Sequence, residues 1–172
     1  MGLLENTLII LLLIAISAFC STSEISLAAA RKLKLKQLAA SGDPRAATVL
    51  ELQRQPGRFF TTIQIGLNAV AILGGILGEE AYGPFFSGTL LPYVGNAATA
   101  ATLGSVLSFV LVTASFVLLA DLLPKRVAIV APEAIALRIA GPMALCIRLL
   151  SPLVWAFNGA ASLIMSRFGL PE

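Results

Sequence analysis

The chain has 172 residues, of which 58% are hydrophobic and only 12% are charged. Because a soluble globular domain carries about 25% charged residues, this composition argues against a soluble enzyme and favours a protein embedded in a lipid bilayer. The formal net charge is +3 and histidine is absent. The absence of histidine argues against intramembrane hydrolysis by a Ser–His pair or an HExxH zinc site, so we expect no enzymatic activity.

Three apolar stretches are as long as membrane-spanning helices, which need roughly 20 residues. They cover residues 7–30, 59–78 and 97–123, and the segment 79–96 reads as a loop. Gly74, Gly75 and Gly78 in the second stretch suggest close helix packing. The sequence therefore predicts an all-α membrane protein with three transmembrane helices.

The basic residues gather at the cytoplasmic ends expected for these spans. No Lys or Arg occurs between residues 59 and 124, and the clusters that flank the spans are Arg31, Lys32, Lys34, Lys36, Lys125 and Arg126. The positive-inside rule then places the N-terminus outside and the C-terminus in the cytoplasm. We interpret these clusters as topology signals and expect no nucleic-acid partner. Cys20 and Cys146 have no metal-ligand spacing and read as buried apolar residues.

Two further segments are expected to form a juxtamembrane helical belt on the cytoplasmic side. Residues 31–57 predict a helical hairpin in which Asp43 caps the second helix and Pro44 occupies its first position. Residues 133–167 are apolar, but Gly141-Pro142 and Ser151-Pro152 are expected to interrupt any long helix there. The uncharged stretch 149–166 leaves a fourth span as the alternative.

Polar side chains inside the first span suggest a cation path. Ser17, Ser21 and Glu24 are four and then three residues apart, which places them on one helical face. An ionisable residue at membrane depth is costly, and it is a functional-site hypothesis by default.

The second and third spans carry matching oxygen-bearing groups. Gln64 and Asn68 are four residues apart with Gly66 between them, and Asp121 precedes Pro124, which is expected to free the carbonyl of Ala120. Such oxygen ligands suit hard ions such as Mg²⁺. Two alternatives stay open: the amides hold helices together, and Asp121 pairs with Lys125 at i+4.

These three segments resemble the motifs of the CorC/CNNM transporters. The matching stretches are residues 17–24, 64–68 and 121–125, in the order and at the spacing of the family's first, second and third helices. The resemblance implies a homodimeric, multi-pass domain of the bacterial inner (plasma) membrane, with three spans and a juxtamembrane belt. Cytoplasmic CBS domains normally follow this unit and are expected in the full-length protein.

The family's dehydrated cation site implies five ligand positions here: Ser17, Ser21, the carbonyl of Gly66, Asn68 and Asp121. Ser23, Glu24 and Gln64 are expected along the substrate path. Most family members have glutamate where this chain has Asp121, so the carboxylate is one methylene shorter here.

The resemblance also suggests the substrate. Residues 23–29, 59–61, 64–76 and 131–138 are similar to a branch of the family that exports polyamines, which implies efflux of putrescine and cadaverine. Efflux of Mg²⁺ is the alternative, and a membrane scaffold or sensor that transports nothing is the second alternative. No resident cofactor is expected, with Mg²⁺ or polyamine bound only as substrate.

Overall fold

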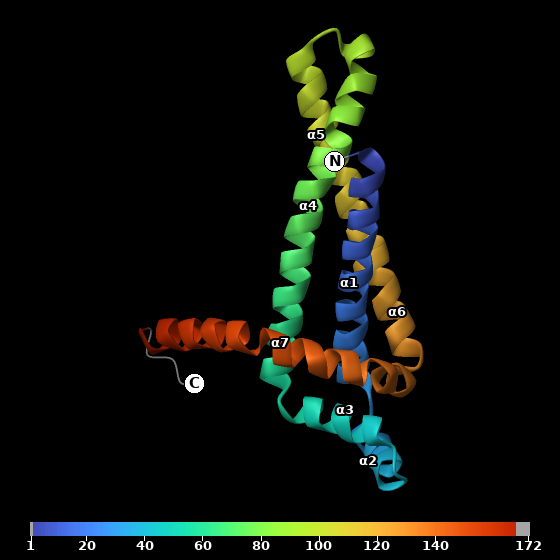
Figure 1. Cartoon of the computed structure of the whole chain (residues 1–172), viewed down its shortest axis with the longest axis vertical. Helices are drawn as coiled ribbons and strands as arrows, with labels where there is room; N and C mark the ends of the chain where they lie inside the picture. The colour runs from blue at the N-terminus through green and yellow to red at the C-terminus, as the bar shows by residue number, and fades with distance from the viewer. Residues whose placement is uncertain (1, 168–172) are drawn as a thin grey trace. The chain divides into compact units, whose positions relative to one another are not determined.

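The chain folds into helices, as the computed structural model shows for residues 2–167 (Figure 1). The helices are α1 (Leu3–Ala29), α2 (Lys32–Ala40), α3 (Pro44–Arg54), α4 (Pro56–Val94), α5 (Ala97–Ser115), the π-helix η1 (Phe116–Leu122), α6 (Leu123–Val130) and α7 (Pro132–Arg167). Within the described residues there is no strand.

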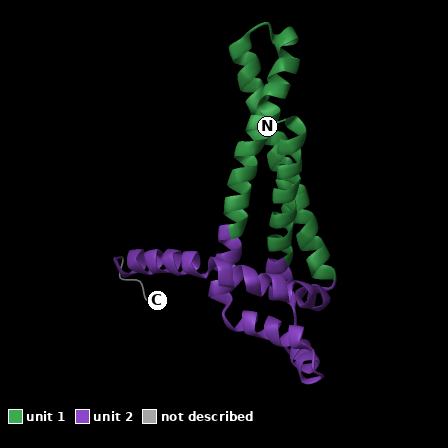
Figure 2. Ribbon diagram, viewed as in Figure 1, with its two compact units in different colours: residues 1–22, 66–130 green, residues 23–65, 131–172 purple. Residues whose placement is uncertain are grey.

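The chain divides into two compact units, which Figure 2 colours separately. Unit 1 contains residues 1–22 and 66–130, and unit 2 contains residues 23–65 and 131–172. Helices α1 and α4 therefore contribute residues to both units.

Among residues 2–167, four helical segments are long and apolar enough to cross a membrane: Leu3–Ala29, Pro56–Val94, Ala97–Val130 and Pro132–Arg167. The first three contain nearly all of the predicted spans, and the fourth contains the alternative span 149–166. By length and composition α7 qualifies as a fourth crossing. The three-span count and the dimer stay predictions.

The predicted loop over residues 79–96 is wrong, because α4 continues through Pro84 and Pro92 to Val94. At about 1.5 Å per residue this helix is about 58 Å long, well beyond the roughly 30 Å of a bilayer core. The actual turn is short. Gly95 adopts a φ of +70°, and the Asn96 side chain accepts hydrogen bonds from the backbone N–H groups of Ala98 and Thr99 to cap α5.

Contact with α5 explains why α4 stays helical so far, and the two helices form a long hairpin in unit 1 (Figure 1). The Ser108 hydroxyl donates to the carbonyl of Gly78 at 2.7 Å, and that of Ser105 donates to Glu79 Oε1 at 2.9 Å. At Gly104, a Cβ would lie 2.7 Å from the backbone nitrogen of Ser87. The helices therefore touch at backbone distance.

The glycines predicted to pack helices differ in their surroundings. A Cβ on Gly74 would lie 2.3 Å from the ring of Phe116, and one on Gly78 would lie 2.4 Å from Val112. A Cβ on Gly75 would meet nothing within 4 Å. Gly74 and Gly78 are thus required by close packing, as small residues commonly are between membrane helices.

Helix α1 joins this hairpin in unit 1 through apolar and polar contacts. Ile10 and Ile14 are buried in a cluster with Ala81 and Ala120. Thr7 lies three residues before Ile10, and its hydroxyl is hydrogen-bonded to the hydroxyl of Tyr82 at 3.0 Å.

Unit 2 contains the helical hairpin of α2 and α3, and its capping follows the sequence pattern. Asp43 accepts from the backbone N–H of Arg45 at 2.9 Å, and Pro44 begins α3. The Arg45 guanidinium also binds the Asp43 carboxylate and lowers its pKa. Because the pKa of Asp43 is lower in the folded chain than in the unfolded chain, its ionised carboxylate stabilises the fold at pH values above the unfolded pKa. This stabilisation is lost as the pH falls through the lowered, folded-state pKa.

The expected interruption of residues 133–167 is also wrong, because α7 runs unbroken through Pro142 and Pro152. Both prolines are exposed. The buried residues follow a three-and-four spacing along another face: Glu133, Ala136, Ala140, Met143, Ile147 and Val154. A continuous packing stripe on this face compensates for the backbone hydrogen bonds that the prolines remove.

Polar contacts tie α7 and α3 to the end of α1 within unit 2. The buried carboxylate of Glu133 accepts from Arg31 Nε at 2.8 Å and lies 3.4 Å from Lys34 Nζ. The Gln53 amide donates to the carbonyl of Leu27, in the last turn of α1, and to that of Ala30, just after the helix. Carbonyls at the end of a helix need such partners because the helix itself supplies none.

Glycine substitutions test the α4–α5 contact. We expect Gly104→Ala to destabilise the fold by about 1–3 kcal/mol, since the new methyl group meets backbone atoms of α4 that have no free space. Gly88→Ala is the matched control, because a Cβ there meets nothing within 4 Å and alanine favours a helix. Thermal unfolding in detergent measures both, and an unchanged melting temperature for Gly104→Ala would refute the close contact.

Candidate cation site

The polar face predicted for α1 is buried in the structure. In unit 1, Ser17 and Ser21 are 5% and 0% exposed, and they continue a stripe that begins with Asn6, Ile10 and Ile14. The spacing of four, four, three and four residues keeps this stripe on one side of the helix. Two hydroxyls therefore stand among apolar contacts, where hydroxyls need partners.

Ser21 finds its partner on another helix. Its hydroxyl donates to Asp121 Oδ1 at 3.0 Å, and the same carboxylate oxygen lies 2.7 Å from Lys125 Nζ. Asp121 thus pairs with Lys125 on its own helix, which was one of the two interpretations from the sequence, and it also binds Ser21 across helices. Its role as a cation ligand stays a prediction. The side chain of Asp121 is 45% exposed.

The backbone around Asp121 departs from a regular α-helix. Asp121 lies in η1, whose end is marked by the Leu123 N–H donating to the carbonyl of Leu118, five residues earlier. The departure comes directly before Pro124, which has no N–H to donate. Single π-turns inside α-helices occur often at functional sites. The sequence pointed to an irregular backbone at Pro124 but not to this hydrogen-bond pattern.

The predicted residues of the second span are less closely connected. A Cβ on Gly66 would lie 3.4 Å from Cys20 Sγ, so this glycine faces α1 beside the serine face. The side chain of Asn68 is exposed, and nothing in the described part of unit 1 joins it to the Ser21–Asp121 pair. The structure therefore brings Ser21 and Asp121 together, places Ser17 one turn away, and leaves Asn68 apart.

Three residues expected on the substrate path belong to unit 2. Ser23 is fully buried, Glu24 is half-buried and Gln64 is exposed. Within the residues described, no three His, Cys, Asp or Glu side chains are grouped so as to hold a metal ion. The oxygens that the structure brings together at Asp121 are its own carboxylate and the Ser21 hydroxyl.

The sequence interpretation missed two features of unit 1. The amide oxygen of Asn6 is buried and has no hydrogen-bond partner among the described atoms. Its place in the same four-residue spacing as Ile10 and Ile14 was the available signal. The bond between Thr7 and Tyr82 had no local signal, since its residues are 75 positions apart.

Comparisons with known proteins agree with this architecture. Residues 8–172 match the family described as the cyclin M transmembrane N-terminal domain, CNNM. The chain is 54% identical over 169 residues to a polyamine export protein of Escherichia coli K12, and 53% identical to one of Salmonella typhimurium. It is 46% identical to a polyamine export protein of Haemophilus influenzae.

Each of these alignments covers 98% of this chain. The chain in turn spans 38% of the length of the first two relatives and 39% of the third. The family match extends over nearly the whole chain, including α1, α4, η1 and α7. The chain therefore belongs to the CNNM transmembrane-domain family.

Proposed function

We propose that this chain is the membrane core of a cation exporter of the CorC/CNNM type, with polyamines such as putrescine and cadaverine as its substrates. The observation that carries the proposal is the Asp121 carboxylate in an apolar helical segment, to which the fully buried Ser21 hydroxyl donates a hydrogen bond from another helix. An ionisable side chain at membrane depth costs free energy, and its presence there therefore indicates a functional site.

The present partners of Asp121 indicate which chemistry it accepts. Its Oδ1 atom already binds a primary ammonium group, that of Lys125, at 2.7 Å. A substrate ammonium carries the same charge and the same N–H donors, so it can replace Lys125 at this oxygen. The buried hydroxyl of Ser17, one turn away, supplies a further acceptor along the path.

The names of the relatives favour polyamine over Mg²⁺. Three relatives, 46% to 54% identical, are named polyamine export proteins. The arrangement of carboxylates points the same way, because a small dehydrated Mg²⁺ ion needs near-octahedral oxygen ligands. Within the described residues, no three His, Cys, Asp or Glu side chains are grouped so as to surround such an ion. Mg²⁺ efflux remains the second candidate, supported by the hydroxyl, amide and carboxylate oxygens that suit hard ions.

In the proposed mechanism, the site at Asp121 is accessible from one side of the membrane at a time, as alternating access requires. Substrate ammonium binds Asp121 and displaces Lys125, and return of Lys125 to the carboxylate favours release. A homodimer and cytoplasmic CBS domains belong to the same proposal.

Efflux measurements test the role of Asp121. We expect Asp121→Asn to lower the rate of putrescine efflux by about tenfold or more, since the amide keeps the shape but loses a charged hydrogen bond worth about 1.5–3 kcal/mol. The readout is loss of labelled putrescine from cells that produce the full-length protein. Glu79→Gln is the matched control, because Glu79 is also a carboxylate bound by a serine of unit 1. Equal efflux by both variants would refute the proposal.

Ligand-dependent stabilisation separates the candidate substrates. We expect putrescine to raise the melting temperature of the purified chain in a saturable way, because a ligand that binds only the folded state stabilises it. Butylamine, with one ammonium group, and Mg²⁺ serve as comparisons. A larger shift with Mg²⁺ than with putrescine would favour the divalent-cation reading. No shift with either would favour a scaffold that transports nothing.

A further inference from the structure

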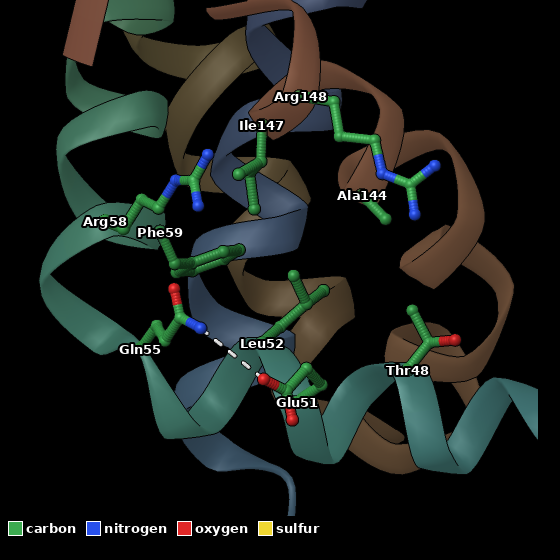
Figure 3. Close-up of a pocket in the computed structure, with 9 residues that line it drawn as sticks. All are labelled: Thr48, Glu51, Leu52, Gln55, Arg58, Phe59, Ala144, Ile147 and Arg148. Carbon is green, nitrogen blue, oxygen red and sulfur yellow. Dashed lines mark hydrogen bonds between the residues drawn. The ribbon is translucent and has the colours of Figure 1, made fainter. Parts of the chain in front are cut away.

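Unit 2 contains a pocket of about 300 Å³ that the proposed cation path does not use. It lies between α3, the start of α4 and the middle of α7 (Figure 3). We call it the Arg58–Arg148 pocket after the two basic residues that line it.

The two guanidinium groups stand on different helices and on opposite sides of the pocket, as Figure 3 shows. Arg58 is at the start of α4, and Arg148 is in α7. Arg58 also donates a hydrogen bond to the hydroxyl of Ser151, three residues after Arg148. This bond ties the start of α4 to α7, and both arginines line the same pocket.

The floor between them is apolar. Phe59 is 1% exposed and Ile147 is 8% exposed, and Leu52 of α3 also lines the pocket (Figure 3). A ligand that fits must therefore combine a group that accepts guanidinium N–H bonds with a part that tolerates apolar contact.

One acidic side chain also lines the pocket, and its charge is already matched. The Glu51 carboxylate accepts from Arg54 Nη1 at 3.3 Å and from the Gln55 amide at 3.4 Å. With Arg58, Arg148 and Glu51 as its charged lining residues, the pocket carries a net positive charge. It therefore favours an anion over a cation such as the proposed substrate.

Both arginines stand at the same kind of boundary in the sequence. Arg58 is the last charged residue before the uncharged stretch 59–78, and Arg148 is the last before the uncharged stretch 149–166. Basic residues at such boundaries lie at the level of lipid headgroups. Basic pockets between helices on the cytoplasmic side of membrane proteins bind anionic lipid headgroups.

We propose that the Arg58–Arg148 pocket binds an anionic glycerophospholipid, with the lipid phosphate held between the two guanidinium groups. Each guanidinium can give two parallel N–H bonds to phosphate oxygens. The glycerol backbone and the first acyl carbons rest on Phe59 and Ile147. A free phosphate ion would leave this apolar floor uncovered, which is why the lipid is favoured.

The experiment compares ligands by the melting temperature of the purified chain in a neutral detergent. The probes are phosphatidylglycerol, phosphatidylcholine with the same acyl chains, and sodium phosphate. We expect only phosphatidylglycerol to raise the melting temperature saturably. In Arg148→Gln the half-saturating concentration should rise by about tenfold or more, since a charged two-pronged contact is lost. Arg138→Gln, on the same helix but outside the pocket, is the matched control and should respond like the unmodified chain.

Two further variants keep the outcome interpretable. Arg148→Lys retains the charge without the planar fork and should give an intermediate response, which serves if Arg148→Gln does not fold. Asp121→Asn should keep the full lipid response, so failure of the cation proposal is distinguishable from failure of this one. Equal stabilisation by phosphatidylcholine or by sodium phosphate would overturn the lipid proposal. An unchanged response in Arg148→Gln would overturn it as well.

Discussion

The hydrogen bond from Ser21 to Asp121 is the interaction on which the site in unit 1 depends. It joins α1 to η1 through a serine that is fully buried and a carboxylate whose side chain is 45% exposed. Removal of one partner from such a pair leaves the other polar group without its hydrogen bond, which costs free energy. The carboxylate accepts a hydrogen bond from one neutral hydroxyl and forms an ion pair with the ammonium group of Lys125.

The backbone of unit 1 is arranged to make that bond possible. Helix α4 contacts α5 closely at Gly104 and Gly78, and it contacts η1 at Gly74. These contacts position the helix that continues into η1. The π-turns of η1 end next to Pro124, where a regular α-helix would lack a donor. The irregular hydrogen-bond pattern therefore coincides with the segment that carries Asp121.

Local patterns predicted much of this structure from the sequence. The spacing of Ser17 and Ser21, the Asp43 cap and the apolar stretches all depend on neighbours along the chain, and the helices follow them. The prolines of α7 misled the prediction. Proline marks a lost hydrogen bond, but packing on the opposite face decides whether the helix continues, as it does past Pro142. The pairing of Ser21 with Asp121 spans 100 positions and follows only from the folded arrangement. The family motifs implied that Ser21 and Asp121 belong to one site, because such motifs mark residues that come together in the folded protein.

Binding of labelled putrescine to the purified chain in nanodiscs tests directly whether Asp121 binds the substrate. The account predicts saturable binding that unlabelled cadaverine displaces, together with its loss when Asp121 is replaced by asparagine and its retention when Glu79 is replaced by glutamine. Unchanged putrescine affinity in the Asp121 variant would contradict the account, because the site would then lie elsewhere.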